Sequence, residues 1–249
     1  MCRWGRMRDR QDICDDRDGG DARDPELRTA SRLTALSSAL GLGASPWRVI
    51  ERVRALYRSI DAEVETRAAS FDLPCHSGCD ACCHEAVFLS APEFLVVVAE
   101  LLTSQDSSVL HQIREEMEKL AERFSDELEL LDAIEGGPER DEVAARIKFR
   151  CPLLDSGGRC SVYGSRELNA RTFGLTWDER RDHPFGCTLT HDRLRVVSPS
   201  TPDATLGRLP LAGARAARRK LVDAFPEPSA KVQVYPWWFR EYADHLEAD

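Results

Sequence analysis

The sequence predicts a mainly helical α+β protein in which a small, irregular cysteine-rich region with a hairpin packs against several helices. Apolar residues recur at helical spacing in long segments, alternating segments are few and short, and the cysteines gather in two blocks. Residues 31–249 are expected to form a single globular domain. Residues 1–30 are expected to be a disordered extension, because Arg, Asp and Gly dominate there and aliphatic residues are scarce.

Two helices are predicted from their start signals. Ser45-Pro46 places a capping residue before a proline of the first turn, and apolar residues then recur at helical spacing as far as Val64. Ser90-Ala91-Pro92-Glu93 is a capping box with a proline just inside the helix, and the apolar segment that follows reaches Leu102.

The later elements are predicted from periodicity and from glycine and proline breaks. A long helix is expected over 107–134, and one apolar stripe on it indicates its core face: Leu110, Ile113, Met117, Leu120 and Phe124. A short helix is expected over 141–148, a strand or hairpin over 188–198 and a basic helix over 212–225. The last helix is expected over 236–246, with Trp237-Trp238-Phe239 packed on the core.

Composition limits the classes of function. The net charge of −9 argues against nucleic-acid binding, which needs a basic surface. The longest apolar run, 94–99, is too short to cross a bilayer, and no secretory signal is evident. We therefore expect a cytoplasmic protein whose nine cysteines stay reduced. The expected partner is a metal ion, with no nucleic acid and no membrane, and a protein partner is left open.

The first cysteine block is the strongest chemical signal in the chain. Cys75, Cys79, Cys82 and Cys83 lie within nine residues. The gap between Cys79 and Cys82 lets both sulfurs face one metal, whereas adjacent Cys83 points elsewhere, so four ligands from this run alone would be strained. We expect at least one ligand from the later cysteines Cys151, Cys160 and Cys187, or a cluster together with a separate ion.

The second block reads as a hairpin. The run from Cys151 to Tyr163 consists of two short extended pieces around Gly157-Gly158. The turn brings Cys151 and Cys160 toward each other.

Together the two blocks resemble the YkgJ-type cysteine cluster proteins, a family described as chelating zinc or iron. The resemblance is carried by the first cysteine run ending in Cys82-Cys83, by Glu93, and by the block 149–166 with its Cys-Pro-Leu-Leu, Gly158-x-Cys160 and Arg166. The resemblance spans residues 71–190, which are therefore the expected metal-binding region, and it implies a zinc or iron site, mononuclear or an iron–sulfur cluster. The ligands that we expect are Cys75, Cys79, Cys82, Cys83, Cys151, Cys160 and Cys187.

This sequence departs from the family pattern at two positions. The family continues with Arg-Pro and a later Cys-Arg pair, where this chain has Arg166-Glu167 and Ala170-Arg171. One expected cysteine is therefore alanine. Cys187, His183 or His191 would then complete the site, or one position stays open, or the site is degenerate. His76 and His84 flank the first block and are expected beside the ligands rather than among them.

Several functions remain open at this stage. Structural zinc is the simplest reading of a thiolate cluster. The spacing Cys75-x-x-x-Cys79-x-x-Cys82 also occurs in radical S-adenosylmethionine enzymes, although their repeated strand–helix units are not predicted here, and a Cys79/Cys82 redox pair would need a parallel sheet. The family resemblance includes flagellin lysine methylases, so an iron–sulfur-dependent, methyltransferase-like protein-modifying enzyme is the alternative. No catalytic residue and no organic substrate follow from the sequence.

Overall fold

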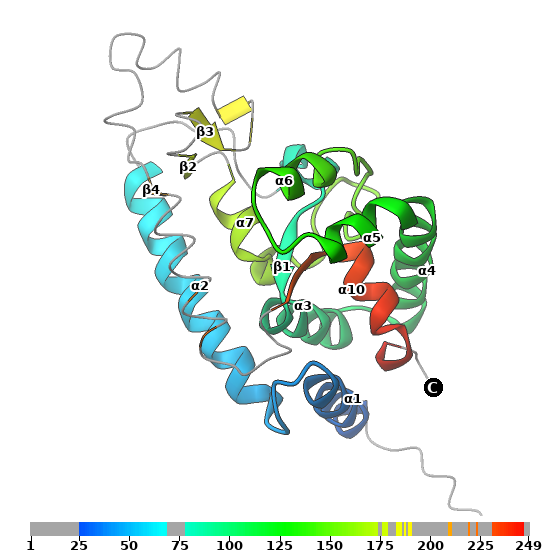
Figure 1. Ribbon diagram of the computed structural model, residues 1–249. Coiled ribbons are helices and arrows are strands. Elements are labelled where there is room, and N and C mark those ends of the chain that lie inside the picture. The colour runs from blue at the N-terminus through cyan, green and yellow to red at the C-terminus, as the bar shows by residue number, and fades with distance from the viewer. Residues whose placement is uncertain are drawn as a thin grey trace, which may run out of the picture.

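In the computed structural model, the residues described are 25–68, 78–173, 176–178, 183–185, 187, 189–190, 209–210, 219, 223 and 231–246. The architecture is mainly helical with small sheets, which confirms the predicted fold class. Figure 1 shows α2 (Pro46–Ala68) along one side of the molecule and α4 (Ser107–Arg123) and α10 (Tyr235–Glu241) on the other, with α3 (Ala91–Ser104) between them.

The folded part begins earlier than the sequence predicted. Helix α1 spans Pro25–Ala39, so residues 25–30 are helical rather than disordered. The reason is the apolar face formed by Leu33, Leu36 and Leu40, which are buried against the rest of the core. This face packs on α3 and stabilises the helix back to Pro25. Cys2 and Cys14 lie outside the described residues, and α2 begins at Pro46 as predicted.

Helix α3 is the central element of the core. Phe94, Leu95 and the valines at 96–98 are all fully buried, and a helix that is apolar on every side needs neighbours all round. Its N-terminus carries the predicted capping box between Ser90 and Glu93. The α3 neighbours include α1, α2 and α4.

The Glu93 carboxylate connects three elements. It accepts hydrogen bonds from the Ser90 N–H (2.8 Å) and hydroxyl (2.7 Å), from the Leu168 N–H (2.8 Å) and from the Tyr57 hydroxyl (3.5 Å). The side chain is fully buried. These contacts attach the start of α7 (Leu168–Thr172) to α3 and α2, and so position the segment that follows the second cysteine block.

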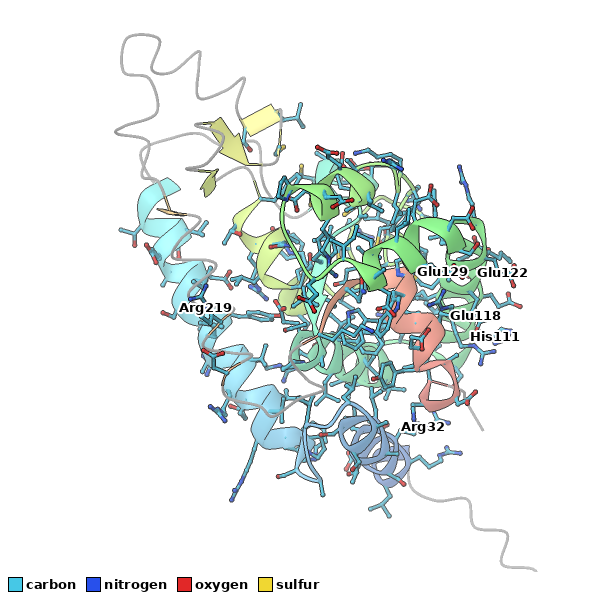
Figure 2. The ribbon with its side chains drawn as sticks, in the orientation of Figure 1. Arg32, His111, Glu118, Glu122, Glu129 and Arg219 are labelled. Carbon is cyan, nitrogen blue, oxygen red and sulfur yellow. The ribbon has the colours of Figure 1, made fainter. Side chains whose placement is uncertain are left out.

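The predicted long helix is divided in two. Helix α4 ends at Arg123 and α5 spans Ser125–Ala133, with Phe124 between them outside helical geometry. The Phe124 ring turns into the core, 6.4 Å from the Phe149 ring, and this packing explains the break. The predicted apolar stripe does face the core, whereas Glu118, Glu122 and Glu129 lie on the outer side of α4 and α5 (Figure 2). Helix α6 spans Pro138–Ala144, earlier than expected.

A two-stranded antiparallel sheet joins the middle of the chain to its C-terminal part. Strand β1 (Phe88–Ser90) pairs with β5 (Val232–Val234), with Leu89 opposite Gln233. Helix α10 follows β5 directly and a short 3-10 helix, η3 (Ala243–His245), ends the described part. As predicted, residues 237–239 are buried in the core.

The second sheet lies in a sparsely described region. Strand β2 (Thr176–Asp178) pairs antiparallel with β3 (His183–Phe185) and parallel with β4 (Leu209–Pro210). Most of the strand predicted at 188–198 and of the basic helix predicted at 212–225 lies outside the described residues, and residues 189–190 are helical. None of the helices in the described part of the chain has both the length and the apolar character that a membrane crossing requires.

Candidate metal centre

The first cysteine block ends in a short 3-10 helix. Helix η1 spans Ala81–His84, and the Cys83 N–H donates to the Asp80 carbonyl at 2.8 Å. Consecutive side chains of an ideal 3-10 helix lie about 120° apart, yet the Cys82 and Cys83 thiols are hydrogen-bonded to each other. Cys75 and His76 lie outside the described residues.

The second block forms the tight turn that its glycines predicted. The Asp155 carboxylate accepts hydrogen bonds from the Gly157 and Arg159 N–H groups, both at 2.8 Å. Gly158 has a positive φ of 75°, a conformation that favours glycine. Leu154 and Cys160 then form an antiparallel bridge. The turn thus brings Cys160 back beside Leu154, three residues after Cys151.

The two blocks contact each other directly through the backbone. The Cys151 N–H donates to the Cys83 carbonyl at 2.8 Å. Glu85 and Lys148 form an antiparallel bridge, and their side chains form an ion pair. These contacts hold the Cys82-Cys83 pair against the second block.

One small pocket contains the side chains of both blocks. Its volume of about 30 Å³ leaves room for one or two water-sized groups or an ion. Four cysteines line it, together with charged, polar and apolar residues: Cys82, Cys83, Cys151, Cys160, Glu85, Arg166, Glu167, Tyr235, Val87, Phe149, Leu153, Val162 and Ala170. All four cysteines are free and half-buried.

The thiols differ in their electrostatic environment. A hydrogen bond from the Cys83 thiol lowers the pKa of Cys82, and the same bond raises the pKa of Cys83. Burial raises the pKa of Cys151 to about 12 and also raises that of Cys160. The pocket therefore favours neutral thiols at three of the four positions, and metal binding there requires that these thiols release protons.

Glu167 brings a carboxylate into the same pocket. Its side chain accepts the Tyr235 hydroxyl at 2.6 Å and the Ala170 N–H at 3.2 Å, and the residue is only 2% exposed. Burial raises the pKa of Glu167 and raises that of Tyr235. A carboxylate capping helix α7 is thus held next to the thiols.

The two arginines that could neutralise a thiolate site have different roles. Arg166 lines the pocket, and its guanidinium lies 3.6 Å from the centre of the Tyr163 ring. Its positive charge acts to lower the pKa of Cys82 and of Cys160. Arg171 instead donates to the Gly164 carbonyl, pairs with Asp61 at 2.5 Å and does not line the pocket. Of these two arginines, Arg166 is the one that lines the pocket beside the cysteines.

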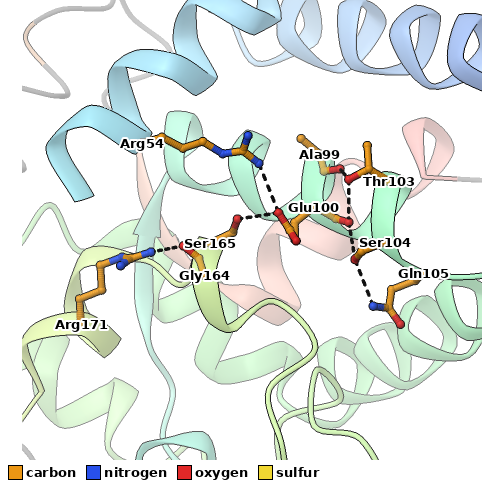
Figure 3. A network of polar contacts seen from close by, with 9 residues as sticks. All are labelled: Arg54, Ala99, Glu100, Thr103, Ser104, Gln105, Gly164, Ser165 and Arg171. Carbon is orange, nitrogen blue, oxygen red and sulfur yellow. Dashed lines mark hydrogen bonds and ion pairs between the residues drawn. The ribbon is translucent and has the colours of Figure 1, made fainter. Parts of the chain in front are cut away.

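Polar contacts fix the segment between the hairpin and Arg166. Figure 3 shows the Glu100 carboxylate accepting from Arg54 (3.2 Å) and from the Ser165 hydroxyl (3.1 Å), with Arg171 bonded to Gly164 close by. The short 3-10 helix η2 (Tyr163–Ser165) is thereby tied to α3 and α2. This arrangement fixes the backbone on which Arg166 and Glu167 follow.

The structure unites only part of the predicted ligand set. Cys82, Cys83, Cys151 and Cys160 share the pocket, whereas Cys79 and Cys187 are described but do not line it. Among the described residues, no group of three or more His, Cys, Asp or Glu side chains could hold a metal ion in the orientations present. The metal ligation predicted from the sequence therefore stays a prediction.

His84, His111 and His245 do not line the pocket. His84 lies 3.5 Å from Asp80, and both side chains are half-exposed. His111 pairs with Glu115 on the outer face of α4, and His245 lies in η3 beside Tyr242. His191 lies outside the described residues.

Sequence reasoning missed Glu167 and Tyr235 as pocket residues. Glu167 could have been noticed as an acidic residue where the YkgJ-type pattern has proline, but Tyr235 had no local signal because it reaches the pocket only through the β1–β5 pairing. Ala170, the position of the missing cysteine, does line the pocket.

No protein-family model, no curated protein and no solved structure matches this chain. The resemblance to the YkgJ-type proteins rests on the quoted residues and stays a prediction.

Proposed function

We propose that this protein chelates zinc or iron through Cys82, Cys83, Cys151 and Cys160. The observation that carries the proposal is that free thiols from two sequence-distant blocks line one small pocket. A lone buried cysteine is ordinary core packing, but four around one hollow, together with a carboxylate, form a donor set suited to a metal ion. The small volume suits an ion better than an organic substrate.

Binding requires the thiols to move, because no described group is arranged to hold a metal ion. Cys82 and Cys83 are hydrogen-bonded to each other, and that bond has to break before both thiols can face a shared ion. The backbone contact between Cys83 and Cys151 already holds the two blocks together. The proposed role is structural or in metal handling in the cytoplasm, where thiols stay reduced.

Metal analysis of the full chain purified without oxygen tests this function. Stoichiometric zinc in a colourless protein supports a mononuclear site, whereas iron with acid-labile sulfide and visible absorption supports an iron–sulfur cluster. Replacing Cys82, Cys83, Cys151 and Cys160 together by serine should abolish either signal. Protein that binds neither metal, even after reconstitution under reducing conditions, would refute the proposal.

Ala170 offers a gain-of-function prediction. Its side chain is 8% exposed and lines the pocket, so Ala170→Cys offers a four-coordinate zinc ion a thiol that can replace one of the adjacent Cys82 and Cys83 thiols, which are hydrogen-bonded to each other. We expect zinc binding that is about tenfold tighter in a competition titration. Changes to the residues around metal ligands alter metal affinity on this scale. The matched control is Ala144→Cys, which adds a thiol at a buried alanine of α6 away from the pocket. Equal affinities for the two variants would contradict the prediction.

A further inference from the structure

Two carboxylates are buried in this part of the fold, and their hydrogen bonding differs. Glu93 accepts four hydrogen bonds from described groups and does not line the pocket. Glu167 lines the pocket and, within the described part of the chain, accepts two, from Tyr235 and from Ala170. An ionised carboxylate has about four acceptor positions, so Glu167 has capacity left.

Glu167 also has no ion-pair partner among the described residues. Glu85, the other carboxylate of the pocket, is paired with Lys148 and is more exposed. Burial raises the pKa of this 98% buried carboxyl group, and the positive charge of Arg166, which also lines the pocket, opposes that effect. Glu167 thus presents oxygen acceptors beside four thiols in a pocket with room for an ion.

We propose that Glu167 ligates the metal through a carboxylate oxygen in place of one of the four pocket thiols, so that a four-coordinate centre has mixed sulfur and oxygen donors. This inference rests on the proposed chelating function. The Tyr235 hydroxyl and the Ala170 N–H orient the carboxylate, as hydrogen-bond partners commonly do for ligands in metal sites. A mixed donor set favours a single zinc or iron ion over an all-thiolate iron–sulfur cluster.

The composition of the ligand shell can be measured directly on the wild-type chain. X-ray absorption at the zinc edge of the zinc-loaded protein should show sulfur at about 2.3 Å and a shorter oxygen shell at about 2.0–2.2 Å. A shell of sulfur alone overturns the inference and leaves the chelating function intact. A wild-type chain that binds neither zinc nor iron removes both, and a chain that binds only iron is measured in the same way at the iron edge.

Variants identify the source of the oxygen. Glu167→Gln should weaken zinc binding by about 10- to 100-fold or more, the range seen even for partners of metal ligands. Glu85→Gln is the matched control, because it removes a pocket carboxylate that already has a cationic partner, and it should change the affinity far less. Equal losses of zinc affinity for the two variants would mean that charge alone sets the affinity. An unchanged affinity of Glu167→Gln would mean that water supplies the oxygen ligand. Either result would overturn the inference. If Glu167→Gln does not fold, the wild-type ligand shell still decides.

Discussion

The substitution Cys151→Ser is expected to abolish stoichiometric metal binding. It should also lower the free energy of unfolding of the protein as purified. A hydroxyl keeps its proton and is a poor ligand for the ions that thiolates bind. Structural thiolate sites supply folding free energy on the order of 10 kcal/mol, so the loss of one ligand should be visible in urea unfolding. Metal content by mass spectrometry and unfolding curves with and without chelator measure the two effects.

The matched control is Cys187→Ser, since Cys187 is also half-buried but does not line the pocket. Cys187→Ser should keep its metal, and chelator should still lower its free energy of unfolding. Cys151→Ser should contain no stoichiometric metal, and chelator should not change its unfolding curve. A Cys151→Ser variant with one equivalent of metal would contradict the proposed ligand set. If chelator does not change the urea unfolding curve of the wild-type chain, the metal does not stabilise the fold and its role is not structural.

Trp238→Ala is expected to destabilise the fold by about 3–5 kcal/mol, the usual cost of removing a large aromatic side chain from a core. Trp238 is 1% exposed, its ring stacks on Phe94 at 5.4 Å, and its indole N–H lies 3.1 Å from the Leu89 and Gln233 carbonyls. Alanine therefore leaves a cavity and removes the donor that links α10 to the β1–β5 sheet. Urea unfolding followed by circular dichroism measures the change.

Trp47 provides the comparison for this substitution. It lies in the first turn of α2 and is 49% exposed, so Trp47→Ala should change the free energy of unfolding by no more than about 0.5 kcal/mol. Similar effects of the two tryptophan substitutions would show that the C-terminal helix is not the anchor that its packing indicates.

Local signals in the sequence were sufficient for the elements that depend on them. The starts of α2 and α3 follow from Ser45-Pro46 and the Ser90–Glu93 capping box, and the Gly157-Gly158 turn follows from its glycines. The break at Phe124 and the helicity of residues 25–30 were not predictable in this way. Both depend on burial against distant segments, and periodicity alone does not report such contacts.

The candidate site was also predictable only in part. The cysteine spacing indicated that the two blocks would meet, and the structure places Cys82, Cys83, Cys151 and Cys160 in one pocket. The spacing gave no reason to expect Cys79 outside that pocket, because the thiols that face one ion are set by the backbone conformation of the folded chain. Glu167 and Tyr235 enter through tertiary contacts that link α7 and α10.

The hydrogen bond between Cys151 and Cys83 has a consequence for biosynthesis. Because the chain is made from its N-terminus, Cys82 and Cys83 leave the ribosome before α3, α4, α5 and α6, and their partners follow only afterwards. A metal that bridges the blocks would close this long loop as a cross-link does, which in the chain-entropy account stabilises the folded state by about 4 kcal/mol. Ion capture would then be a late event in maturation, and newly made chains would depend on metal supply more than mature ones.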